Sequence, residues 1–299
     1  MTGASPPTGL PRVPTLPRVP PLPRVLVEPV VRAALAEDLG RAGDLTTDAL
    51  IDPDVRATGA IRARRAGRVA GVEAARLAFE LLDPAVRITV AADNGTPVAA
   101  GATILRLDGP ARALLTGERV ALNLLGHLSG IATATADLVA AVAGTRAAIA
   151  DTRKTTPGLR TLEKAAVRAG GGRNHRFGLD DAVLIKDNHI QLAGDPAAAV
   201  RQARAAVGHL VKIEVEVDTL DQLAAVLPEG PDAVLLDNMD VHSLRTAVAR
   251  IDGRAVAEAS GTVTLESAPA IAATGVDLIS AGWLTHSAPA LDVGLDVDA

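Results

Sequence analysis

The sequence predicts an α/β protein in which a smaller domain of mixed helices and strands precedes a larger domain built on parallel strands. After residue 145, short β-branched runs recur between Ala-rich helical segments, and each run ends in a polar or Gly-rich group. This is the rhythm of a parallel barrel or an open parallel sheet. Before residue 125, helix and strand signals alternate without that rhythm. With 299 residues, 48% of them hydrophobic, the chain can bury a substantial core.

Residues 1–29 are predicted to form a disordered tail. They contain nine of the 19 prolines and three copies of LPRV at a six-residue spacing. Such a segment favours extended, polyproline-like conformations and cannot bury a core. It also lacks the continuous apolar stretch of a secretory signal.

Residues 30–128 are predicted to form the smaller domain with its connecting helix. A helix is expected over residues 30–40, and strands near residues 57–71 and 86–93. The second strand alternates apolar and polar side chains, as a half-buried sheet requires.

Two further helices are predicted over residues 114–143, with a break at Ser129 and Gly130. No run is long enough to span a bilayer, so no membrane segment is expected.

Residues 129–285 are predicted to form the parallel domain, and residues 286–299 a strand that returns to the smaller domain. A barrel is preferred to an open sheet. Barrels place their active sites at the carboxyl ends of the strands, and phosphate often binds the loops after the last two. The predicted strands end near residues 151, 186, 216, 237, 258 and 280, and the last two loops carry Ser260, Gly261, Ser280, Ala281 and Gly282.

Composition excludes several classes of function. A net charge of −5 and a pI near 5.7 provide no overall basic footprint for nucleic acid or an anionic membrane. The absence of cysteine excludes disulfides, thiolate catalysis and Cys-ligated metals, and is compatible with a reducing cytoplasm.

Lysine is rare, and its positions are clustered. Only four of the 30 cationic residues are lysines, namely Lys154, Lys164, Lys186 and Lys212, all within one fifth of the chain. Either this is chance, or a compact ammonium is required there that a planar guanidinium cannot replace.

Two segments of the parallel domain concentrate cations. In DTRKTTPGLR, Arg153 and Lys154 follow a predicted strand, and Thr156 is expected to cap a helix that begins at Pro157, which would favour an anionic ligand. In GGGRNHRFG, three glycines precede His175 and Arg176, so the backbone can approach a ligand closely. A solvated charge pair and a flexible linker are the alternatives.

Acidic residues end other strands. The period of two places Glu214 and Glu216 on one face, and Asp237 ends the next strand. Buried carboxylates need a cation, a metal or hydroxyl groups, and Lys212 or Lys186 is the alternative partner for one of them. His286 is expected either to contact phosphate or to hold its own loop.

Taken together, these residues resemble the quinolinate phosphoribosyltransferases, a family of type II phosphoribosyltransferases. The resemblance covers most of the chain from residue 37 onwards, in one order. The matching pieces are EDLGRAGDLTTDAL, GERVALNLLGHLSGIATAT, DTRKTTPGLRTLEKAAVRAGGGRNHRFGL, VLIKDNHI, IEVEVDTL, LLDNM, EASGTVTLE and GVDLISAGWLTHSAPALDVGLDV.

The resemblance implies an N-terminal α/β sandwich domain and an incomplete, open α/β barrel. It also implies a cytoplasmic enzyme, at least dimeric, that joins quinolinate to phosphoribosyl pyrophosphate with Mg²⁺. The products are nicotinate mononucleotide, pyrophosphate and carbon dioxide. Nucleic acid and membranes are not expected partners.

The family implies a role for each matched residue. Arg153, His175, Arg176 and Lys186 would bind quinolinate, with Arg119 reaching in from the partner subunit, and Lys154 would contact pyrophosphate. Glu216 and Asp237 would hold the ribose hydroxyls or Mg²⁺, directly or through water. Lys154, Lys186, Glu216 and Asp237 are the catalytic candidates, and Thr152, Ser260, Gly261, Ser280, Ala281, Gly282 and His286 complete the substrate-binding set.

The sequence departs from the family at Thr262, Trp283 and Ala165, where a second Gly, a small residue and an aromatic residue are more usual. Three other functions stay open at this stage: phosphoribosyl transfer to nicotinate or another ring without decarboxylation, a non-catalytic phosphosugar or nucleotide sensor, and a lyase that uses Lys186 or Lys154 as a Schiff base.

Overall fold

The computed structural model describes residues 20–298 and divides them into two compact units. One unit combines residues 20–139, 151–174 and 282–298, and is called the sandwich unit below. The other combines residues 140–150 and 175–281, and is called the barrel unit. The predicted tail lies largely outside the described residues.

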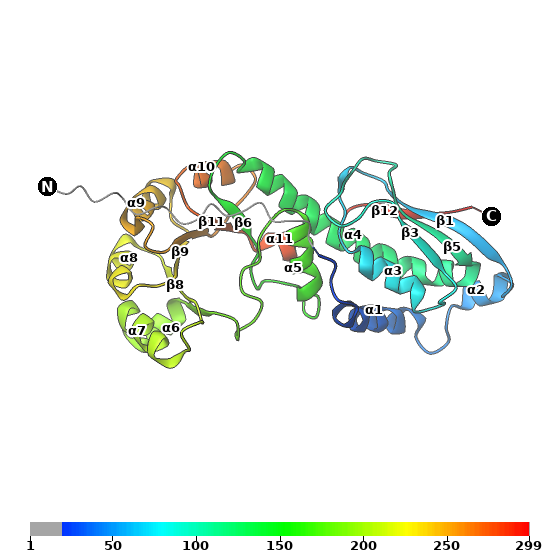
Figure 1. Ribbon diagram of the computed structural model, residues 1–299, viewed down its shortest axis with the longest axis horizontal. Coiled ribbons are helices and arrows are strands. Elements are labelled where there is room, and N and C mark those ends of the chain that lie inside the picture. The colour runs from blue at the N-terminus through cyan, green and yellow to red at the C-terminus, as the bar shows by residue number, and fades with distance from the viewer. Residues whose placement is uncertain (1–19, 299) are drawn as a thin grey trace. The chain divides into compact units, whose positions relative to one another are not determined.

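The barrel unit is built on a six-stranded parallel sheet in the order β6-β11-β10-β9-β8-β7. The strands curve, with helices outside them, and no described strand joins β6 to β7, so the predicted incomplete barrel is confirmed (Figure 1). The strands are β6 (Ala148–Ala150), β7 (Val183–Ile185), β8 (Ile213–Val217), β9 (Ala233–Asp237), β10 (Val256–Ser260) and β11 (Leu278–Ser280). The helices are α6 (Asp187–Ala193), α7 (Pro196–Ala206), α8 (Leu220–Val226), η1 (Leu227–Glu229), α9 (Val241–Ile251) and α10 (Ala268–Ala272).

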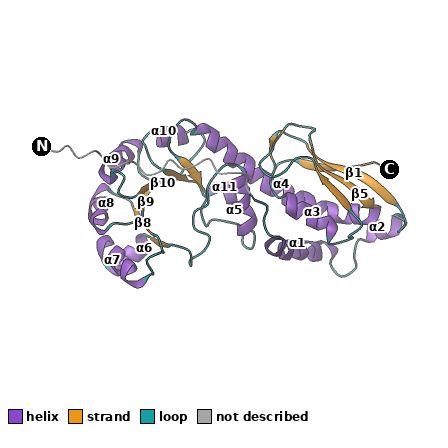
Figure 2. Ribbon diagram, in the orientation of Figure 1, coloured by secondary structure: helices purple, strands orange, loops and turns teal. Residues whose placement is uncertain are grey.

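The sandwich unit contains an antiparallel sheet in the order β12-β1-β5-β3, with helices packed against it (Figure 2). The final strand pairs with β1, as predicted. The strands are β1 (Arg56–Ala63), β3 (Arg87–Val90), β5 (Thr103–Pro110) and β12 (Val293–Asp298), and a separate ribbon joins β2 (Gly67–Arg68) to β4 (Pro97–Val98). The helices are α1 (Arg24–Leu39), α2 (Leu45–Leu50), α3 (Val72–Glu80), α4 (Ala111–Ala141), α5 (Arg160–Ala169) and α11 (Trp283–His286).

Helix α1 begins earlier than predicted, so residues 24–29 do not belong to the tail. Pro29 is the sixth residue of the helix, so α1 forgoes the bond that an N–H at this position would donate to the carbonyl of Val25. Glu28 accepts from Arg24 and Arg32, one turn away on either side, and supports the exposed face. Local ion pairs and the burial of Val27 and Val31 outweigh the proline signal.

Helix α4 is continuous, so the predicted break at Ser129 and Gly130 is wrong. A side chain at Gly130 would place its Cβ 2.2 Å from Pro289 O, and Ser129 Oγ bonds to both backbone groups of Ala70. These residues permit close tertiary packing rather than a turn. Contrary to the prediction, α4 is long and apolar enough to span a membrane. However, 56% of its most apolar 18-residue window is buried inside the protein. It is a core helix here.

Candidate active site

An acidic cluster lies at the carboxyl ends of β8 and β9 in the barrel unit. Glu216 near the end of β8, Asp218 just after it and Asp237 at the end of β9 each offer a carboxylate oxygen, all within 4.8 Å of one another. Glu216 and Asp237 were predicted from the sequence, whereas Asp218 was not. The sequence contains a signal for Asp218, because this residue continues the two-residue spacing of Glu214 and Glu216 along the strand.

Lys186, the residue after β7, reaches this cluster. Its Nζ lies 2.8 Å from Glu216 Oε2. One of the two predicted lysine partners is therefore confirmed, whereas Lys212 pairs with Asp232 at 2.7 Å. Three carboxylates beside one ammonium retain a net negative charge, and they are hard oxygen donors of the kind that suits Mg²⁺.

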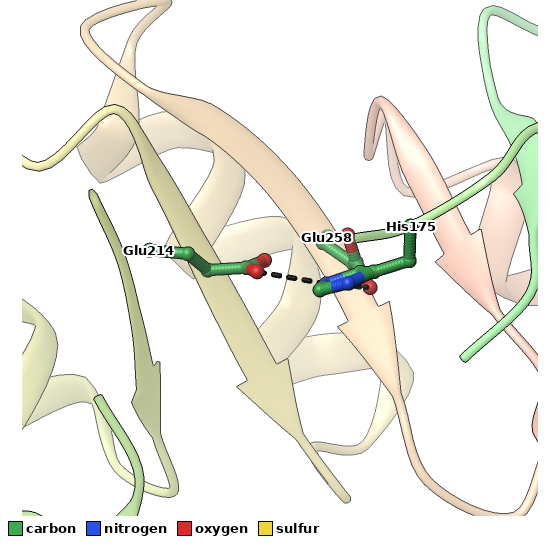
Figure 3. Close-up of side chains that lie close together, drawn as sticks. All are labelled: His175, Glu214 and Glu258. Carbon is green, nitrogen blue, oxygen red and sulfur yellow. Dashed lines mark hydrogen bonds and ion pairs between the residues drawn. The ribbon is translucent and has the colours of Figure 1, made fainter. Parts of the chain in front are cut away.

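A second cluster is formed by the buried Glu214 on β8, the buried Glu258 on β10 and the half-buried His175 on a loop (Figure 3). His175 Nδ1 accepts from the backbone N–H of Arg176 at 2.8 Å, so Nε2 carries the proton and donates to Glu214 Oε2 at 2.8 Å. Both ring nitrogens are thus engaged by the chain. A ligand carboxylate that binds His175 must displace one of these contacts.

The protonation states of the two carboxyl groups in this cluster depend on each other. Burial, followed by the nearby Glu214 carboxylate, raises the pKa of Glu258 to about 8. Glu258 is therefore protonated at neutral pH.

The segment with Arg153 and Lys154 belongs to the sandwich unit and follows β6 along the chain. Helix α5 begins only at Arg160, so the predicted cap at Thr156 and start at Pro157 are wrong. Gly158, at φ +81°, turns the chain before the helix. The two cations therefore lie on a loop and not at a helix N-terminus.

One buried donor on this loop nevertheless has no partner in the described part of the chain. Arg153 Nε is buried and has no hydrogen-bond partner among the described residues. Lys154 is exposed, and its backbone N–H donates to Thr152 Oγ1 at 3.0 Å. A buried donor of this kind is expected to have a partner when a ligand is bound.

Gly282 lies against this loop within the sandwich unit. A Cβ there would lie 2.8 Å from Lys154 Cδ and 3.3 Å from Thr152 Oγ1. His286 Nε2 is also close, at 3.6 Å from that position, while His286 Nδ1 bonds to Ser287 Oγ at 2.6 Å. Four predicted site residues, Thr152, Lys154, Gly282 and His286, are thereby brought together.

The other predicted glycine-rich loop follows β10 in the barrel unit. Gly261 has φ +128°, and a Cβ there would lie 2.4 Å from Asn238 Oδ1, so both backbone and space require glycine. Ser260 O accepts from the Asn238 N–H at 3.0 Å. Ser280 and Ala281 are buried; the Ser280 hydroxyl contacts Ala259 O, and Ala281 N donates to Ala150 O.

The two remaining arginines differ in setting. Arg176 in the barrel unit donates to Ala182 O at 3.0 Å, which ties its side chain to the start of β7. Arg119 on α4 is exposed and lines a cavity of about 320 Å³ in the sandwich unit together with Asp38 and Asp44.

Family models match almost the whole described chain. One for the quinolinate phosphoribosyl transferase C-terminal domain matches residues 131–296, and one for the N-terminal domain matches residues 44–129. The chain belongs to the quinolinate phosphoribosyltransferase family. The family that the sequence motifs predicted is therefore confirmed.

Individual relatives agree. A nicotinate-nucleotide pyrophosphorylase (carboxylating) of Mycobacterium leprae is 47% identical over 89% of this chain and 95% of its own length. A probable enzyme of the same name from Bacillus subtilis is 46% identical, over 87% and 90%. The solved structure of the Francisella tularensis nicotinate-nucleotide pyrophosphorylase has a TM-score of 0.89 at 38% identity, and covers 95% of this chain and 100% of that one.

Proposed function

We propose that the protein transfers the phosphoribosyl group of phosphoribosyl pyrophosphate to quinolinate and releases pyrophosphate, carbon dioxide and nicotinate mononucleotide. Family membership and the names of the relatives support this activity. The observation from the structure that carries it is the buried Nε of Arg153, beside Lys154, which has no hydrogen-bond partner within residues 20–298. A cationic loop with a guanidinium Nε that is open to an acceptor suits a substrate with two carboxylates.

Quinolinate is a flat dianion, and the proposed roles of the cations follow from its shape. Arg153 and Arg176 bind carboxylates through planar forks, and Lys186 supplies a point charge. His175 contributes mainly its ring, because both of its nitrogens have partners in the chain. A single carboxylate, as in nicotinate, would need fewer cations, which favours quinolinate.

The acidic cluster is the proposed site for Mg²⁺ and the ribose hydroxyls. Its three carboxylates fit the preference of Mg²⁺ for hard oxygen ligands and retained water. When bound, Mg²⁺ would neutralise charge on the pyrophosphate. Lys154 is proposed to contact pyrophosphate, while the backbone at Gly261 and Gly282, with Ser260 and His286, surrounds the 5-phosphate.

The reaction needs no protein nucleophile. The pyridine nitrogen forms a bond to the anomeric carbon as the bond to pyrophosphate breaks, through an oxocarbenium-like state that positioning and charge stabilise. The ring nitrogen is then positive. The bond to the 2-carboxylate breaks next, its electrons remain on the ring carbon beside that nitrogen, and a proton takes the place of carbon dioxide. We assign Lys186 to assist loss of the carboxylate.

The test is single-turnover product analysis with quinolinate labelled at the 2-carboxylate, phosphoribosyl pyrophosphate and Mg²⁺. We expect labelled carbon dioxide with nicotinate mononucleotide from the wild type and none from Arg153→Ala. Arg201→Ala is the matched control, because Arg201 forms an exposed ion pair with Glu229. No release from folded wild type would refute the quinolinate assignment and favour nicotinate transfer or sensing.

A dimer in the cytoplasm, with Arg119 acting across the interface, completes the proposal. The role of Arg119 is supported by its exposure on α4, where it is accessible to a partner subunit. Mixing the inactive variants Arg119→Ala and Arg153→Ala should restore part of the activity, because a mixed dimer contains one intact site. No recovery after subunit exchange would place Arg119 outside the partner's site.

A further inference from the structure

Helix α5 carries two adjacent residues of opposite charge, Glu163 and Lys164, whose side chains are both fully buried. Neighbouring helical residues point about 100° apart, so the two side chains reach different parts of the protein. A buried charge is costly unless it is paired and hydrogen-bonded. Neither residue belongs to the proposed substrate-binding set, so their partners are informative.

Lys164 holds the beginning of the cationic loop. Its Nζ forms an ion pair with Asp151, whose side chain is also fully buried and which directly precedes Thr152. The second carboxylate oxygen of Asp151 accepts from Asn174 Nδ2 at 2.6 Å, and the same amide donates to Lys164 O at 2.8 Å. Asn174 is in turn the residue before His175. One buried lysine thus fixes the chain positions that precede two groups of substrate-binding candidates.

Glu163 holds the end of the same loop. Its Oε2 accepts the backbone N–H of Thr156 at 3.0 Å, and its Oε1 lies 2.8 Å from His127 Nε2 on α4. Between the two anchors, the carbonyl of Lys154 accepts from Thr285 Oγ1 at 2.9 Å. The four residues 152–155 are therefore tied at both ends to consecutive residues of one helix.

We propose that Glu163 and Lys164 are positioning residues that clamp this loop and so set the places of Arg153 and Lys154. The inference rests on the proposed function for its consequence in catalysis, and on the described contacts for the clamp itself. A displacement of about 1 Å at a substrate-positioning group can cost about 100-fold in rate. The clamp also gives a reason for a lysine at position 164 in an arginine-rich chain, because a compact ammonium needs less buried space than a planar guanidinium.

A single and a double variant that remove buried charges distinguish an effect on loop position from an effect on stability. Lys164→Met removes the ammonium that neutralises the buried Asp151 carboxylate, so both melting temperature and activity should fall. Asp151→Asn with Lys164→Met removes both charges and should restore most of the melting temperature. We expect kcat/KM for both substrates to stay about tenfold or more below wild type in the double variant. Recovery of activity together with stability would make the pair merely structural and overturn the proposal.

Two substitutions of Glu163, one conservative and one disruptive, test its role in holding the loop. Glu163→Gln keeps an acceptor for the Thr156 N–H, and its amide can donate to the other tautomer of His127, so activity should stay within about threefold of wild type. Glu163→Leu removes both contacts and should lose about tenfold or more. Equal activity of the two variants would overturn the assignment of Glu163. Lys212→Met, which breaks the exposed pair with Asp232, is the matched control.

Hydrogen exchange of the peptide containing residues 152–159 tests the clamp independently of the reaction. The amide of Thr156 should exchange faster in Glu163→Leu than in wild type or Glu163→Gln. Unchanged exchange would refute the clamp even if activity fell. Faster exchange in an enzyme that releases no carbon dioxide from quinolinate would retain the clamp and reject the proposed function.

Discussion

Replacing Glu258 with glutamine tests the protonation of the buried cluster with His175 and Glu214. Burial and the Glu214 carboxylate raise the pKa of Glu258 to about 8 from an ordinary value of 4.5. Glutamine has nearly the shape of a protonated glutamate but does not titrate. The variant should therefore reproduce the protonated state of the wild type at every pH.

The sign and size of the effect follow from the two pKa values. Between 4.5 and about 8 the folded protein holds a proton that the unfolded chain has lost, so the stability present at low pH is lost as pH rises. The free energy of unfolding falls by up to about 1.4 kcal/mol per pH unit over that window. Between pH 5 and pH 8 the wild type should lose about 3 kcal/mol relative to Glu258→Gln.

Urea unfolding followed by far-UV circular dichroism at pH 5 and pH 8 measures this difference. We expect nearly equal stabilities at pH 5 and a variant more stable by about 3 kcal/mol at pH 8. The control is Glu266→Gln, because Glu266 is exposed and its pKa is lowered by a hydrogen bond with Thr264. A wild-type deficit that is the same at both pH values would refute the assignment of a protonated Glu258.

Three further substitutions test close contacts and the loop cations. Gly130→Ala should destabilise the protein by about 2 to 3 kcal/mol, because its Cβ would lie 2.2 Å from Pro289 O; unchanged urea unfolding would show that this contact is looser. Gly282→Ala should lower kcat/KM about tenfold at unchanged melting temperature, since the new Cβ displaces the Lys154 side chain; wild-type kinetics would contradict this. Arg153→Lys keeps the charge but loses the planar fork, so KM for quinolinate should rise about tenfold, and an unchanged KM would argue against bidentate binding.

The sequence predicted the parallel sheet well because its strands are short apolar runs that end in polar residues. The six observed carboxyl ends lie within two residues of the predicted ones, and the returning strand β12 was also predicted. Local patterns were less informative where tertiary contacts decide. Ser129 and Gly130 carry the residue types of a break, yet Gly130 is required for close approach of residues 289–290.

The candidate site was predictable by residue type but not by hydrogen bonding. The motifs predicted Arg153, Lys186, Glu216 and Asp237 but not Asp218, and the ion pair of Lys186 with Glu216 was among the predicted alternatives. Which nitrogen of His175 carries a proton depends on Glu214, 39 residues away, and on the neighbouring backbone. The buried partners of Glu163 and Lys164 likewise arise only from the packing of α5.

The pairing of β12 with β1 has a consequence for synthesis of the protein on the ribosome. Ile61 pairs with Leu295, so one edge of β1 stays open until β12 has been translated. An open edge strand invites pairing with other chains, and such long-range closure is slow. The barrel unit, which lies between β1 and β12 along the chain, can fold before the antiparallel sheet of the sandwich unit is complete. The nascent chain should therefore depend most on chaperones before β12 has been made, and deletion of residues 293–298 should lower solubility before it lowers catalytic activity.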